Sequence, residues 1–112
     1  MSDNLRNHLP LLKSVAQNRN HRSRQTHLKH AANDLQFHKC MKEICRNVVK
    51  RKVPFSLNDV KKLRKFKTAI KELASNRTSR VKRKKHIVQA GAGFLPILIP
   101  IISSLLAGFL GK

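Results

Sequence analysis

The chain has 112 residues, of which 25 are Lys or Arg and five are Asp or Glu, so its formal net charge is +20. A chain of this length holds one small domain with a thin core, which excludes a large enzyme built around a deep active-site cleft. Because so large a positive charge repels itself, it indicates a polyanionic partner, either nucleic acid or an anionic lipid surface.

The first 25 residues predict a basic N-terminal arm with a weak helix. Apolar residues recur at helical spacing over about 3–17, although Pro10 opposes a helix there: Leu5, Leu9, Leu12 and Ala16. The segment Asn18 to Gln25 has no apolar residue and predicts a mobile basic linker. The N-terminus lacks the apolar stretch of a signal peptide, so we expect the chain on the cytosolic side of any membrane.

Residues 26–76 predict a basic helical hairpin. Apolar residues fall mainly on one face of a helix over about 26–51: Leu28, Ala31, Ala32, Leu35, Met41, Ile44, Cys45, Val48 and Val49. Pro54 ends this helix, and Ser56 and Asp59 form a capping box for a helix over about 57–74. The apolar stripe of the second helix is Val60, Leu63, Phe66 or Lys67, Ile70 and Leu73. The two stripes are expected to pack against each other in an antiparallel pair.

Two cysteines lie five residues apart in the first helix of the hairpin, at Cys40 and Cys45. At that spacing a helix directs them apart, so we predict reduced packing residues and no disulfide. The six histidines lack suitably spaced carboxylate or thiolate partners, and we predict neither a metal site nor a cofactor. The chain also has no glycine-rich phosphate loop, GxSxG motif or paired carboxylates on one helix face, so we expect a binding protein and not an enzyme.

A basic segment and an apolar segment complete the chain. Ser75 to Ser79 interrupts the helical pattern, and residues 77–90 are expected to be a basic linker. Gly91 to Gly93 predicts a hinge before a hydrophobic C-terminal tail over 91–112. A helix from Pro96 to Leu110, with its hydrogen bonding interrupted at Pro100, would rise only about 22 Å, whereas a bilayer core is about 30 Å thick. Four interpretations stay open: the tail spans a membrane, lies on it, packs on other proteins or completes the core of the hairpin.

The densest positive charge predicts contacts with the phosphate backbone. The residues expected to neutralise phosphate are Lys61, Lys62, Arg64, Lys65, Lys67, Arg77, Arg80, Lys82, Arg83, Lys84 and Lys85. There is no Trp or Tyr, so base stacking on an aromatic platform is not expected, and binding should be independent of sequence. The residues expected to contact membrane or protein are Phe94, Leu95, Pro96, Ile97, Leu98, Ile99, Pro100, Ile101, Ile102, Leu105, Leu106, Phe109 and Leu110.

The junction between the basic run and the tail carries a family resemblance. The stretch from Gly91 to Gly108 follows an Arg/Lys-rich segment and resembles the C-terminal part of adenovirus core protein X, the precursor of the mu peptide. The residues that match its apolar segment in place are Leu95, Pro96, Leu98, Ile99, Pro100 and Ile101. Upstream, Asn47-Val48-Val49, the step Val53 to Ser56 and the basic stretch Lys61 to Lys67 are similar to protein-X-like reading frames of adintoviruses and polinton-type elements.

This resemblance implies a virion core protein that binds and condenses viral double-stranded DNA, located in the virion core and, during assembly, in the host nucleus. Its tail would touch membrane or capsid. The expected fold is all-α: a small basic hairpin with a hydrophobic C-terminal helix, partly disordered when unbound. A membrane-active basic protein that binds and disrupts anionic lipid is the alternative function. An RNA-associated protein would explain the charge but not the apolar tail.

Overall fold

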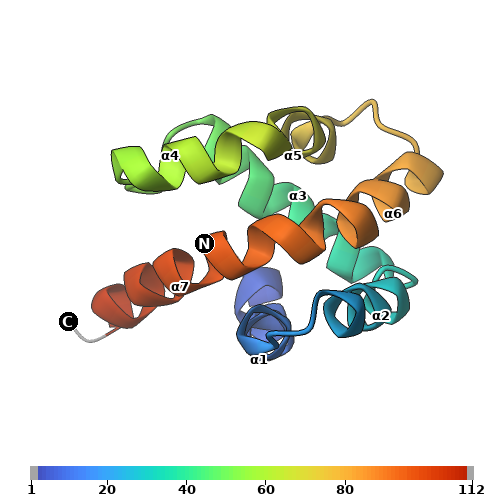
Figure 1. Cartoon of the computed structure of the whole chain (residues 1–112), viewed down its shortest axis with the longest axis horizontal. Helices are drawn as coiled ribbons and strands as arrows, with labels where there is room; N and C mark the ends of the chain where they lie inside the picture. Colours follow the sequence, from blue (N-terminus) through green and yellow to red (C-terminus); the bar gives the residue numbers. More distant parts are fainter. Residues whose placement is uncertain (1–2, 111–112) are drawn as a thin grey trace.

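The computed structural model describes the backbone of residues 3–110 and the side chains of residues 3–104. The described chain is helical and contains no strand, as the sequence predicts (Figure 1). In Figure 1, α6 and α7 cross the middle of the molecule, with α4 and α5 above them and α1 and α2 below. The helices are α1 (Asp3–Gln17), α2 (His21–Ala31), α3 (Leu35–Val49), α4 (Leu57–Leu63), the short 3-10 helix η1 (Arg64–Phe66), α5 (Lys67–Ala74), α6 (Arg80–Gln89) and α7 (Gly91–Leu110).

The N-terminal region differs from the expected arm and linker. Helix α1 has the predicted bounds and includes Pro10, which is exposed. The predicted mobile linker over 18–25 is wrong, because α2 begins at His21. The side chain of Asn20 accepts a hydrogen bond from the backbone N–H of Ser23 and so caps this helix. The asparagine cap is the signal in the sequence for a helix start here, although the first seven residues of α2 include no apolar side chain.

The predicted single helix over 26–51 is two helices. The chain turns between Ala31 and Leu35, and the carboxylate of Asp34 accepts a hydrogen bond from the N–H of Gln36 at the start of α3. Aspartate is a favoured N-cap, so the break lies where the side chain can satisfy a free helix donor. Both cysteines of α3 are free and fully buried, as predicted, and burial raises the pKa of Cys40 and of Cys45 to about 12.

The next helical stretch confirms its predicted start and departs from regularity at its middle. Ser56 and Asp59 form the capping box, with each side chain accepting from the other residue's backbone N–H. The turn η1 then tightens the chain, and Phe66 is half-buried while Lys67 is exposed. This resolves which of the two residues continues the apolar stripe, because a 3-10 turn changes the angular spacing of the side chains that follow it.

From Arg80 onward the described chain is helical except for a break at Ala90. Residues 80–89, inside the expected basic linker, form α6, which Ser79 caps by accepting from the N–H of Lys82. Helices α6 and α7 meet at a bend of 75° beside the predicted glycine hinge. Helix α7 continues through both Pro96 and Pro100, although neither proline has a backbone N–H to donate within it.

One contiguous core draws on every helix from α1 to α7. Helix α7 packs on α1, α2 and α4, and α3 packs on α5. The buried side chains of α7 are central to this core: Ala92, Phe94, Leu95, Leu98, Ile99 and Ile102. Of the four interpretations of the tail, the structure therefore matches the one in which it completes the chain's own core.

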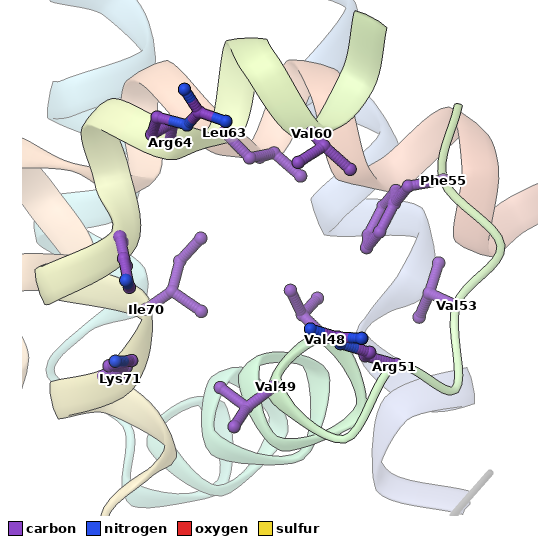
Figure 2. Close-up of a pocket in the computed structure, with 11 residues that line it drawn as sticks. Val48, Val49, Arg51, Val53, Phe55, Val60, Leu63, Arg64, Ile70 and Lys71 are labelled. Atoms are coloured by element: carbon purple, nitrogen blue, oxygen red, sulfur yellow. The ribbon is translucent and has the colours of Figure 1, made fainter. Parts of the chain in front are cut away.

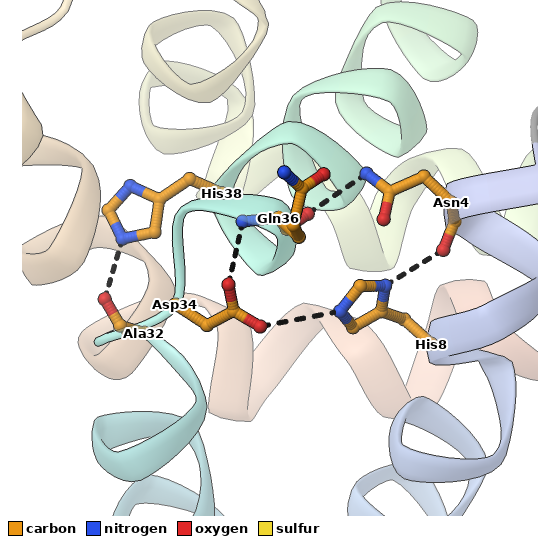
Figure 3. A network of polar contacts seen from close by, with 6 residues as sticks. All are labelled: Asn4, His8, Ala32, Asp34, Gln36 and His38. Atoms are coloured by element: carbon orange, nitrogen blue, oxygen red, sulfur yellow. Dashed lines mark hydrogen bonds and ion pairs between the residues drawn. The ribbon is translucent and has the colours of Figure 1, made fainter.

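A polar network ties α1 to the junction between α2 and α3 (Figure 3). The amide of Asn4 donates to the backbone carbonyl of Gln36, and the Nε2 atom of His8 lies 3.9 Å from a carboxylate oxygen of Asp34. The buried ring of His38 bonds through Nε2 to the carbonyl of Ala32 at the end of α2, over 2.6 Å. The bond from His38 satisfies a carbonyl at the end of α2 that has no partner inside its own helix.

Candidate nucleic-acid interface and apolar groove

Most of the predicted phosphate-binding side chains lie on the surface. Nine of the eleven are exposed, and the other two, Arg83 and Lys84, are partly buried. Ten of the eleven lie on two basic elements, the stretch from α4 to α5 and the helix α6, and Arg77 lies in the turn between them. Helix α5 packs against α6. The structure thus brings the two halves of the predicted set to neighbouring elements of one body.

The basic side chains of α6 are of two kinds: some make hydrogen bonds within the protein and others are exposed to solvent. Arg83 donates from Nε to the carbonyl of Thr78 over 3.0 Å and from Nη2 to the carbonyl of Ser75, so its guanidinium organises the turn before α6. Lys84 donates to the side-chain oxygen of Asn33 over 2.7 Å and fastens α6 to the junction of α2 and α3. Arg83 and Lys84 are therefore partly structural, and the exposed Lys82 and Lys85 are freer to meet a ligand.

Positive charges crowd together where α3 passes α6. The pKa of Lys42 is lowered by partial desolvation and by the nearby charges of Arg46, Arg83 and Lys39. Like charges disfavour the protonated form of an amine, so the three neighbouring cations add to the effect of desolvation on the pKa of Lys42. Sequence reasoning missed this contribution of α3, because it depends on which helices pack together.

The few acidic side chains are used to hold the fold. Asp34 and Asp59 accept hydrogen bonds at the starts of α3 and α4, and Glu72 accepts from the hydroxyl of Thr78 over 2.9 Å. Carboxylates placed at helix starts satisfy free backbone donors. With five acids against 25 Lys and Arg in the sequence, the carboxylates can offset only a small part of the positive charge.

The residues expected to contact membrane or another protein are largely internal. Five of them are buried in the core: Phe94, Leu95, Leu98, Ile99 and Ile102. Pro96, Ile97 and Ile101 are partly buried, and Pro100 is exposed. The side chains of Leu105, Leu106, Phe109 and Leu110 lie outside the described residues. Contact of the five buried residues with a bilayer would require the core to open.

Membrane-span criteria give a limited result. Within the described residues, no single helix is both long and apolar enough to cross a bilayer. By length and composition alone, α6 and the part of α7 up to Ser104 meet the criteria as a pair, although the pair is bent by 75°.

Within the described residues, no group of three or more His, Cys, Asp or Glu side chains could hold a metal ion.

An apolar groove with a cationic rim lies between the end of α3, the loop after it and the stretch from α4 to α5 (Figure 2). Its volume is about 620 Å³. The apolar lining is Val48, Val49, Val53, Phe55, Val60, Leu63 and Ile70, and the cations at its edge are Arg51, Arg64, Lys67 and Lys71. Arg64 and Lys67 are among the residues predicted to neutralise phosphate, whereas Arg51 and Lys71 are not among them.

Comparison with models of protein families, with characterised proteins and with solved structures finds no match to this chain. Its function has therefore to be inferred from two surfaces described above. One is the set of exposed cations on α4, α5 and α6, and the other is the apolar groove beside them.

Proposed function

We propose that the chain is a viral core protein that binds double-stranded DNA through the phosphate backbone and condenses it without sequence preference. The observation that carries this proposal is the exposure of nine predicted cations, eight on two basic elements of which α5 and α6 pack together and one, Arg77, in the turn between them. A basic hairpin of α3 with α4 and α5 would then form one side of the interface, and α6 the other. The resemblance of the tail junction to adenovirus core protein X supports the viral setting.

Dimensions and charge support condensation. The longest extent of the molecule is 39 Å. Duplex DNA carries one negative charge per roughly 1.7 Å of axis, so a segment of that length carries about 23 charges. The formal charge of +20 nearly matches this number. A protein layer at this density would cancel most of the repulsion between neighbouring duplexes.

Counterion release would drive the binding. Each Lys or Arg that meets a phosphate displaces condensed cations, which steepens the dependence of affinity on salt by about 0.9 in log-log slope. We further propose that the unbound chain is partly disordered at low ionic strength, because its cations repel one another, and that the duplex orders it. The proposed contact of the tail with membrane or capsid would involve its last apolar residues.

The affinity of the full chain for two unrelated DNA duplexes across a salt series tests this function. We expect a slope steeper than about −6, equal for both duplexes, because six or more phosphates are contacted. The chain should not be shortened to residues 1–90 for this measurement. Deleting α7 would remove six buried side chains from the core, and a loss of binding would then report unfolding.

A matched pair of double variants locates the interface. Lys82→Gln with Lys85→Gln removes two exposed charges from α6, and Lys13→Gln with Lys29→Gln removes two exposed charges from α1 and α2. We expect the α6 variant to flatten the slope by up to about 1.8, since each lost contact removes about 0.9. The control should change it little. Equal effects of both variants, or a loss confined to one duplex sequence, would contradict the proposed interface.

A further inference from the structure

The groove beside α4 and α5 has an arginine in a costly backbone conformation at its edge. The backbone φ of Arg51 is 56°. Among the described residues, Arg51 is the only non-glycine residue with a positive φ. The N–H of Lys52 bonds to the carbonyl of Asn47, and the N–H of Arg51 bonds to that of Val48, so the chain leaves α3 in a Schellman motif. Glycine is the usual residue at this position because a side chain there adds strain.

The strained position puts a cation on the groove. The side chain of Arg51 lines it, opposite the stretch from α4 to α5 (Figure 2). Arg64, Lys67 and Lys71 follow one another on that stretch at spacings of three and four residues, so they recur about once per helical turn. The groove thus has an apolar base with cations on both sides. A complementary partner would place apolar side chains against the base and negative charges beside the cations.

Part of the apolar lining is open to solvent. Val49 and Val60 line the groove and are still 47% and 44% exposed. A row of cations spaced by helical turns fits several carboxylates along a segment better than the single head group of a lipid. A second copy of the chain is a poor source of this segment, because it has only five acidic residues.

We propose that this groove binds an amphipathic segment of another protein, helical when bound, with apolar residues on one face and Asp or Glu at the borders of that face. Apolar side chains of the segment would fill the space between Val48, Phe55 and Ile70. Its carboxylates would pair with Arg51 on one side and with Arg64, Lys67 and Lys71 on the other. Arg64 and Lys67 also belong to the set proposed to neutralise phosphate, so DNA and the segment would compete for these two side chains, but binding of the segment does not require DNA.

Fluorescence anisotropy tests this proposal with the full chain and a labelled amphipathic peptide of leucine and glutamate, next to a scrambled peptide of the same composition. We expect the amphipathic peptide to bind at least about tenfold more tightly than the scrambled one, because only it presents a continuous apolar face. Equal affinity, or no binding of either, would overturn the proposal. So would groove-dependent binding of phosphatidylserine vesicles in place of the peptide.

Three variants separate the groove from general charge. Val60→Glu places a carboxylate in the apolar lining at a partly exposed position, and it should abolish binding of the peptide. Arg51→Gly should weaken binding about fivefold or more while the fold stays as stable, since glycine suits the positive φ. Lys85→Gln removes the same charge from α6, outside the groove, and should leave peptide affinity unchanged. If Lys85→Gln weakens binding as much as Arg51→Gly, the attraction is not local to the groove and the proposal fails.

Discussion

Arg24 compensates for a proline located far from it in the sequence. Pro96 has no N–H, so the carbonyl of Ala92, four residues earlier in α7, loses its usual partner inside the helix. The Nε atom of Arg24 donates to that carbonyl over 2.8 Å, and its Nη1 atom donates to the carbonyl of Asn18. Because Ala92 is fully buried, no water is at hand to replace this bond.

A double-mutant cycle tests this compensation. Arg24→Met should lower the free energy of unfolding by about 1–3 kcal/mol, the cost of leaving a buried carbonyl unsatisfied. In a Pro96→Ala background the new N–H can serve Ala92, so the loss from Arg24→Met should fall by at least half. Urea unfolding of the four proteins measures both values.

Arg22 provides the matched control for Arg24. It lies in the same helix, carries the same charge and is exposed, so Arg22→Met should change the free energy of unfolding by less than about 0.5 kcal/mol. A loss from Arg24→Met that is the same with and without Pro96 would mean that the guanidinium acts by another route. Nothing in the local sequence around Arg24 predicts its partner, since the bond spans 68 positions.

At the scale of elements, Gly93 allows η1 and α7 to approach closely. A Cβ atom at position 93 would lie 2.5 Å from Cζ of Phe66, whose ring also meets that of Phe94 edge to face. A Cβ at position 91 would have ordinary clearance, with Leu28 Cδ1 at 3.4 Å. Gly93 therefore matters for packing. The bend between α6 and α7 does not require it, because no described glycine has a positive φ.

Alanine at each glycine separates packing from flexibility. Gly93→Ala should reduce the free energy of unfolding by about 1–3 kcal/mol, because the Phe66 ring must move from its site. Gly91→Ala should change it by less than about 1 kcal/mol, as alanine suits a helix at least as well as glycine. Thermal unfolding compares the two. If both variants lose stability equally, the hinge first expected at Gly91 to Gly93 is the better description.

Helix periodicity predicts only some of these elements. The spacing of apolar residues locates α1, and the capping box of Ser56 and Asp59 marks the start of α4. Periodicity misses α6 and the first half of α2, because these sequences are mostly polar or basic and each of the two helices has one buried residue, Leu28 in α2 and Ile87 in α6. Such helices are stabilised by caps at Asn20 and Ser79 and by packing on their neighbours, and neither contribution appears in a count of apolar positions.

The candidate site was predictable in its charge and not in its shape. The basic run and the lysines after Ser56 are evident in the sequence, and most of them are exposed in the structure. The groove is not evident, because it requires the end of α3 to meet the face of α4 and α5. The location of the tail depends likewise on the whole molecule, since an apolar helix suits a membrane and a core equally well.

The whole molecule confines a large charge to a small volume. Its radius of gyration is 13.0 Å and its extents are 39 × 29 × 26 Å. Unfolding separates the cations, so their repulsion favours the unfolded chain. The Debye length falls from about 30 Å at 0.01 M salt to about 8 Å at 0.15 M. At the lower salt concentration it is similar to the extents of the molecule, and at the higher one it is well below them. Added NaCl over this range should therefore raise the free energy of unfolding.

The size of this salt effect should depend on the number of cations. The variant that combines Lys13→Gln, Lys29→Gln, Lys82→Gln and Lys85→Gln keeps the core intact and lowers the formal charge from +20 by four. We expect it to be more stable than the natural chain at low salt and to gain less from NaCl, because less repulsion remains to be screened. Thermal unfolding at the two salt concentrations measures the difference. If the midpoint temperature of unfolding of the natural chain does not change with salt, self-repulsion does not limit the stability of the fold. DNA would then not be needed to order the chain.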